Sequence, residues 1–137
     1  MDQRWWQIEG PDAWKTFKGE FLTSKKVTVQ GTIKAPARPG GNSGAGAVLL
    51  AGYYGAKKIA LLGCDGKYDA NKKRHWHGDH KKGLGNAVSV PKFADQFKEA
   101  ASFLEKTGAP LVINCSPDSA IDFWPKMTIS EALCLKI

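Results

Sequence analysis

A small, apolar helix followed at once by a continuous apolar strand constrains the fold of this chain most. Residues 43–54 read Ser-Gly-Ala-Gly-Ala-Val-Leu-Leu-Ala-Gly-Tyr-Tyr, with small or apolar side chains on nearly every face. Residues 58–62 then form an apolar run of the kind that is buried in a parallel sheet. A helix of this composition is expected against such a sheet, so the order predicts half of a βαβ unit.

The remaining pattern completes an α/β domain. Residues 92–107 form the clearest amphipathic helix, which Gly108 ends. Further strands are predicted at 26–30 and 110–114, and short helical segments at 2–9 and 130–133. We therefore predict a three-layer Rossmann-like α/β fold with a short, mainly parallel sheet flanked by helices, as a single domain over residues 1–137.

Three unusual loops, 36–46, 63–90 and 114–119, fall at the predicted carboxyl edge of this sheet. Ligands of open parallel α/β folds bind outside the carboxyl ends of the strands. The loop 63–90 is also long for a structureless stretch in a small domain, which favours a functional role. We therefore expect the three loops to share one crevice.

The loop 63–90 contains all of the chain's histidines, in the run His-Trp-His-Gly-Asp-His at 75–80. Three interpretations stay open. His75, His77, Asp79 and His80 follow the ligand pattern of dinuclear metal hydrolases and would favour zinc or iron. One histidine could instead act as a catalytic base, since imidazole transfers protons near neutral pH. The third interpretation is a solvated basic loop without chemistry.

Composition limits the function classes. The formal net charge of +7 favours anionic partners, such as nucleotides or sugar phosphates, and is compatible with nucleic acid. No apolar run approaches the ~20 residues of a membrane span, and residues 1–6 do not resemble a signal peptide. Cys64, Cys115 and Cys134 lack zinc or redox spacing, so we expect free thiols, buried at Cys64 and Cys115, and a cytoplasmic location.

The start of the apolar helix is a candidate anion site. Asn42 or Ser43 can cap it, and Gly44 keeps the backbone amides accessible, as phosphate or carboxylate binding requires. Close packing between helix and strand would explain the glycines equally well.

The other two loops supply polar candidates. Asp65 follows the first buried strand and could orient a histidine or a ribose, although an Asp-Gly turn explains it equally well. Asn114, Ser116 and Ser119 follow the second buried strand and could contact a base or a sugar. Capping of the next turn is the alternative, and it is favoured for Asp118.

These segments, taken in order, resemble a known group of proteins. The Asn-Ser-Gly start of an apolar helix, the stretch Gly-Ala-Lys-Lys-Ile-Ala-Leu-Leu-Gly-Cys-Asp and the histidine run are similar to phage and prophage proteins. Those resemble the Rossmann-like domain of 6-hydroxymethylpterin diphosphokinase-like and flagellar motility accessory proteins. The same order, over about residues 40–133, is similar to bacterial sialyltransferases of the Campylobacter type.

The resemblance implies a transferase that uses a nucleotide-activated sugar and no metal at the histidine loop. It implies that His75 is the general base, with Asp79 and His80 beside it, that Ser43 faces the donor carboxylate and that residues 116–119 face the nucleotide. For a phage protein it implies the host cytoplasm. These families begin with a βα unit carrying a Gly-Asn-Gly-type loop, which this chain lacks before Asn42, so we expect a shortened form or a fragment.

Three hypotheses follow. The first is a glycosyltransferase-like domain that binds a nucleotide sugar, with His75 as general base. The second is a non-catalytic phage accessory or binding protein on the same fold. The third is a metal-dependent hydrolase that uses the histidine cluster.

Overall fold

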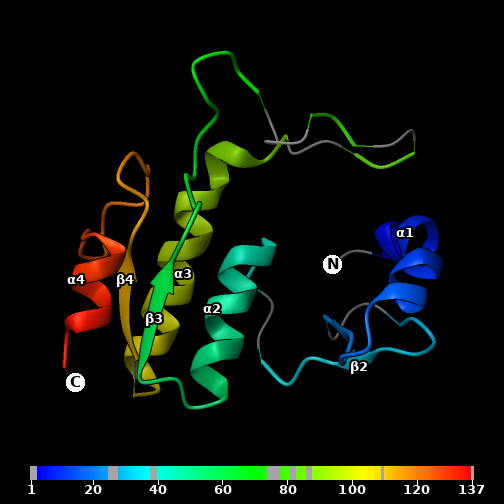
Figure 1. Ribbon diagram of the computed structural model, residues 1–137, viewed down its shortest axis with the longest axis horizontal. Helices are drawn as coiled ribbons and strands as arrows, with labels where there is room; N and C mark the ends of the chain where they lie inside the picture. Colours follow the sequence, from blue (N-terminus) through cyan, green and yellow to red (C-terminus); the bar gives the residue numbers. More distant parts are fainter. Residues whose placement is uncertain are drawn as a thin grey trace.

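The larger part of the described structure is built on a two-stranded parallel sheet. The computed structural model describes residues 3–24, 28–37, 40–73, 78–80, 83–85, 88–108 and 110–136. Strands β3 (Lys58–Leu61) and β4 (Leu111–Asn114) pair in a register that places Lys58 opposite Leu111 and Leu61 opposite Asn114. Both strands therefore end at the same edge of the sheet, at the top of Figure 1.

Helices cover both faces of this sheet. α2 (Ser43–Tyr53) and α3 (Phe93–Lys106) pack on one face, and a short 3-10 turn, η1 (Val90–Lys92), precedes α3. α4 (Ile129–Cys134) lies beside β4 on the other face. The larger apolar core joins the two helices to the sheet and to the loop after β4, through Ala45, Val48, Leu49, Leu61, Phe97, Ala100, Leu104, Val112 and Ile121.

α2 and α3 approach each other closely because α2 carries small residues. A Cβ atom added at Gly52 would lie 2.6 Å from Cδ2 of Leu104 on α3. Gly108 ends α3 as predicted, and Gly55 follows α2 in the same way, with φ angles of +84° and +82°. These left-handed angles favour glycine over residues that carry a Cβ atom.

A second, smaller unit is formed by α1 (Gln3–Thr16), β1 (Leu22–Thr23) and β2 (Ile33–Lys34). Its two strands pair in parallel with each other and form a sheet separate from β3 and β4. Ring contacts join Trp5, Trp6, Trp14, Phe17 and Phe21 in one aromatic cluster. Nε of Arg4 in α1 donates to the carbonyl oxygen of Gly83, so the long loop reaches this unit.

Two predictions about the N-terminal part are wrong. Residues 28–30 of the predicted strand 26–30 form no strand, and residues 25–27 lie outside the described part. No third strand from this region therefore joins β3 and β4 in the described structure. The first helix also continues through Pro11 to Thr16 instead of ending at residue 9. The rings of Trp6 and Trp14, stacked with centroids 5.8 Å apart, lie on either side of that proline along the helix.

The α/β class with short parallel strands is confirmed. The described part of the predicted loop 63–90 contains neither helix nor strand up to Ser89, and its last residue, Val90, begins η1. No helix among the described residues combines the length and apolar character that a bilayer crossing requires.

Candidate functional site

The tip of α2 is held by one side chain, that of Asn42. Its Oδ1 accepts a hydrogen bond from the amide of Ala45 at 2.9 Å, which makes Asn42 the N-cap. Its Nδ2 donates to Oε1 of Gln96 on α3, also at 2.9 Å. Of the two predicted caps, Asn42 is therefore the one used. Because both ends of its amide have partners, Asn42 fixes the helix tip rather than offering a polar group to solvent.

The next two amides of α2 are accessible. Ser43 is exposed and Gly44 is half-buried, and no acceptor among the described residues contacts the N–H of either one. The first N–H groups of a helix lack partners within the helix and carry its positive dipole end. This pair of amides is therefore suited to a phosphate or carboxylate group.

Packing alone accounts for two of the glycines around this tip. A Cβ atom at Gly40 would lie 2.2 Å from the backbone nitrogen of Gly46. At Gly44 it would lie 2.8 Å from Cζ of Phe97. The packing explanation that the sequence left open therefore holds at these positions, and the case for a ligand depends on the accessible amides.

The loops after β3 and β4 are tied together by two serine hydroxyl groups. Oγ of Ser116 accepts from the amide of Cys64 at 3.0 Å. Oγ of Ser119 donates to the carbonyl oxygen of Cys64 at 2.6 Å and accepts from the amide of Ile121 at 3.0 Å. Both serines are buried. The structure thus brings Ser116 and Ser119 together at Cys64, with their oxygens bonded within the protein.

Asn114 has a similar internal role at the end of β4. Its side chain is fully buried, its Nδ2 donates to the carbonyl oxygen of Ile121 at 2.8 Å, and its Oδ1 accepts from the amide of Ser116 at 3.0 Å. Its backbone also pairs with Pro125 and Met127. Asn114 therefore fixes the shape of the turn that follows the strand.

Cys64 and Asp65 lie in the loop that follows β3 at this edge. Asp65 is exposed, and its carbonyl oxygen accepts from the amide of Ala120 at 2.7 Å. Cys64 is half-buried, where a buried thiol had been expected, whereas Cys115 is buried and Cys134 is exposed. Burial raises the pKa of the Cys64 thiol, and the neighbouring Asp65 carboxylate raises it further. At neutral pH Cys64 is therefore a weak nucleophile.

Two lysines that the sequence analysis did not single out lie on the same loops. Nζ of Lys67 binds Oδ1 of Asp118 at 2.6 Å, and this hydrogen bond, followed by the Coulombic attraction, lowers the pKa of Asp118. Nζ of Lys126 donates to the carbonyl oxygen of Ser119 at 2.6 Å. Asp118, expected to cap the following turn, instead joins the loop after β4 to the loop after β3.

Aromatic side chains separate the tip of α2 from the turn after β4. Phe97 contacts Trp124 edge to face with centroids 5.9 Å apart, and Phe123 lies 4.8 Å from Trp124. The rings of Phe123 and Trp124 are half-buried. Phe97 and Trp124 therefore form an aromatic wall between the tip of α2 and the loop after β4. The loops after β3 and β4 meet at the carboxyl edge of the sheet, at the top of Figure 1. The run Ile-Asp-Phe-Trp-Pro at 121–125, apolar for a loop, was the signal for this wall.

The histidine cluster is only partly described. His75 and His77 lie outside the described residues, while Asp79 is exposed and His80 is half-buried. Within the described ranges no three His, Cys, Asp or Glu side chains lie close enough to hold a metal ion. The metal and general-base interpretations of this cluster therefore both stay predictions.

No protein-family model, curated protein or solved structure matches this chain.

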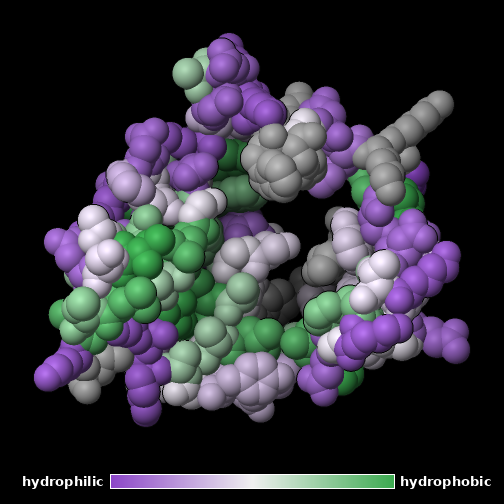
Figure 2. All heavy atoms as spheres, viewed as in Figure 1, coloured by the Kyte–Doolittle hydropathy of each residue, from purple (hydrophilic) through white to green (hydrophobic). Residues whose placement is uncertain are grey.

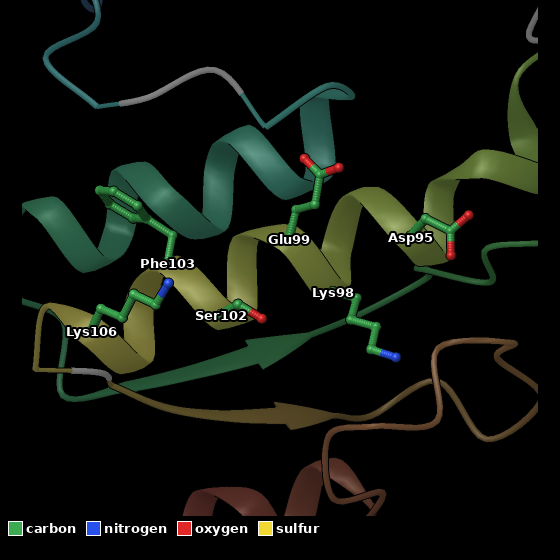
Figure 3. Close-up of a pocket in the computed structure, with 6 residues that line it drawn as sticks. All are labelled: Asp95, Lys98, Glu99, Ser102, Phe103 and Lys106. Carbon is green, nitrogen blue, oxygen red and sulfur yellow. The ribbon is translucent and has the colours of Figure 1, made fainter.

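An open depression of about 490 Å³ lies elsewhere, on the outer face of α3. Figure 3 shows that its six lining side chains all come from this helix: Asp95, Lys98, Glu99, Ser102, Phe103 and Lys106. The two carboxylates balance the two ammonium groups, so the depression has little attraction for an anionic ligand. None of the predicted site residues lines it.

Proposed function

We propose that the chain binds a nucleotide-activated sugar at the carboxyl edge of β3 and β4. The observation that carries the proposal is the pair of accessible amides at Ser43 and Gly44, at the N-terminus of a helix that begins on this edge. Amides at a helix N-terminus bind phosphate and carboxylate groups through hydrogen bonds and the helix dipole. A nucleotide sugar with an acidic sugar carries both groups.

The half-buried ring of Trp124 supports a nucleotide rather than a simple anion. Phe97 lies under Gly44 and contacts Trp124, whose ring is partly accessible. A nucleobase can stack on an aromatic ring for about 1–3 kcal/mol, whichever base it is. The net charge of +7 acts in the same direction by attracting polyanions.

The reaction that we propose is transfer of the sugar to a hydroxyl acceptor. The acceptor oxygen forms a bond to the anomeric carbon while the bond from that carbon to the phosphate oxygen breaks. His75 takes the hydroxyl proton as general base, and the nucleotide leaves with the bonding electron pair on its phosphate. The amides of Ser43 and Gly44 stabilise negative charge on the donor.

Isothermal titration with cytidine and uridine mono- and diphosphates, and with their sugar conjugates, tests the binding step. We expect saturable binding of at least one nucleotide and weaker binding of the matching nucleoside, which lacks phosphate. Absence of heat with every nucleotide would contradict the proposal. Transfer is tested separately with His75→Ala, which should retain binding and lose turnover.

A non-catalytic binding protein is the second candidate, and the buried polar residues favour it. The side chains of Asn114, Ser116 and Ser119 bond within the protein. A domain that kept these loops but had no catalytic activity would have the same internal hydrogen bonds at these three residues. In that case His75→Ala would leave both nucleotide binding and biological activity intact.

A further inference from the structure

β3 has the sequence of a central strand but lies at an edge of its sheet. On the β4 side, the carbonyl oxygens of Lys57 and Leu61 accept from the amides of Leu111 and Cys115, each at 2.9 Å. Alternation along a strand turns the backbone groups of Lys58, Ala60 and Leu62 the other way. Among the described residues, Sγ of Cys64 donates to the carbonyl oxygen of Leu62 at 3.7 Å, and none pairs with the other outward groups. These outward N–H and C=O groups can form backbone hydrogen bonds with another strand.

The usual protection of an edge strand is confined here to the first residue of β3, Lys58. Natural edges carry charged residues, prolines or bulges that prevent pairing with another chain. Residues 59–62 read Ile-Ala-Leu-Leu, without any of these. Ala60 is exposed, and Leu62 is 57% exposed. An unprotected apolar edge of this kind favours pairing with a further strand.

The sheet face next to this edge is also apolar and only half covered. α4 packs over β4, where Ile113 and Ala132 are buried, and leaves the β3 side of the face open. Leu133 on α4 is 73% exposed and Leu135 is 39% exposed. Figure 2 shows apolar surface gathered over α4, β3 and β4. A partner on the β3 edge would cover part of this surface.

We propose that β3 pairs with β3 of a second copy of this chain, antiparallel about a twofold axis at Ala60. Ala60 then lies opposite Ala60 of the other copy, and Lys58 lies opposite Leu62. Every outward N–H and C=O of the three residues gains a partner, as an isologous interface requires. The inference does not depend on the proposed ligand or reaction.

Side-chain chemistry favours a second copy in this register. Ala60 is small enough to face itself across the axis. Lys58 is held by α4, since its Nζ donates to the carbonyl oxygens of Ala132 at 2.7 Å and Leu135 at 2.8 Å. Leu62 of the second copy therefore meets the lysine stem and the apolar end of α4.

The same register places Lys57 opposite Gly63, so no like charges lie directly opposite each other in the paired strands. Because Ala60 fits against itself and Leu62 fits against Lys58, the proposed partner is another copy rather than an unrelated extended peptide.

Sedimentation equilibrium of the full chain, from about 1 µM to about 200 µM, tests the association. We expect a concentration-dependent dimer, and at least about tenfold weaker association for Ala60→Lys and Leu62→Lys, which place charge on the edge. Tyr53→Lys is the matched control, because Tyr53 is 62% exposed at the far end of α2. A wild-type monomer at every concentration would overturn the proposal. So would unchanged dimerisation of both edge variants.

Cross-linking then tests the register in a chain carrying Cys64→Ser and Cys134→Ser. Directly paired residues have Cα atoms about 5.5 Å apart, within the range that a disulfide bridges, so Ala60→Cys should form a covalent dimer under mild oxidation. Leu62→Cys should not, because the two copies of this residue lie roughly 13 Å apart along the strand direction. Cross-linking at position 62 but not at 60 would refute the twofold axis at Ala60.

Discussion

The side-chain amides of Asn42 and Gln96 share a hydrogen bond of 2.9 Å that joins the N-cap of α2 to α3. Because Asn42 also caps α2 through the amide of Ala45, one residue fixes both the start of the helix and its place beside its neighbour. Ser43 and Gly44, whose accessible amides form the proposed anion site, come directly after Asn42 in the chain. The proposed ligand site therefore depends on a hydrogen bond within the protein, between α2 and α3.

Asn42→Ala should lower the free energy of unfolding by about 1–2 kcal/mol, because it removes an N-cap and an interhelical hydrogen bond. Urea unfolding measures the change. Asn42→Asp keeps the cap acceptor and loses the donor to Gln96, so it should cost less. Gln96→Ala removes only the interhelical bond and should resemble Asn42→Asp. Equal losses for Asn42→Ala and Gln96→Ala would show that the cap contributes nothing.

Ser43→Pro should weaken nucleotide binding without weakening the helix. Ser43 is the first residue after the N-cap, where proline is well tolerated, and the extended backbone of Asn42 suits a residue before proline. The substitution removes one of the two amide donors. Ser43→Ala keeps this donor and is the matched control. Titration calorimetry should show a loss of about 1–2 kcal/mol in binding for proline and little for alanine.

Asn114→Ala should destabilise the protein by about 2–4 kcal/mol, since it leaves the buried carbonyl of Ile121 and the amide of Ser116 without their partner. Thermal or urea unfolding measures this loss. Asp122→Ala changes an exposed carboxylate in the same loop and should stay within about 0.5 kcal/mol of the wild type. A comparably small effect at Asn114 would mean that water replaces its hydrogen bonds.

The ion pair of Lys67 and Asp118 predicts a dependence of stability on pH. Because the folded pKa of Asp118 lies below its ordinary value of 3.8, the pair stabilises the folded state above that pH. This stability is lost as the pH falls through the lower folded pKa. Urea unfolding at several acidic pH values should therefore show a shallower decline for Asp118→Asn. Lys67→Met should give the same shallower decline, and the double variant should add nothing further.

Cys64 should react slowly with iodoacetamide near pH 8, because burial and Asp65 raise the pKa of its thiol. Asp65→Asn removes the second cause and should increase the rate at a given pH. Mass spectrometry of the modified peptides separates Cys64 from Cys134. If the rate at Cys64 is the same in both proteins, the carboxylate does not act on the thiol.

The sequence predicted the elements whose signals are local and continuous. The apolar runs of β3 and β4 and the glycines after α2 and α3 need only short-range patterns, and each of these elements lies within one or two residues of its expected bounds. The β-branched run at 26–30 was misleading because tertiary context outweighs β-propensity in short segments. Pro11 was misleading because the packed indole rings on either side of it favour a continuous helix.

The candidate site was predictable at the level of loops but not of side-chain roles. Parallel strands place their following loops at one edge, so the meeting of the segments after β3 and β4 could be foreseen. Which polar atoms bond within the protein could not, since Ser116 and Ser119 find their partners more than fifty residues away along the chain. The wall formed by Phe97 and Trp124 depends on the same kind of distant contact.

The register of β3 with β4 has a consequence for how the chain folds during its synthesis. Leu111 leaves the ribosome 53 residues after Lys58, its partner in the sheet. At about 5–20 residues per second, an apolar strand without its only partner in the described sheet waits roughly 3–10 s. During that interval the apolar run from Ile59 to Leu62 is exposed to aggregation, and slower translation between the two strands would lengthen that exposure.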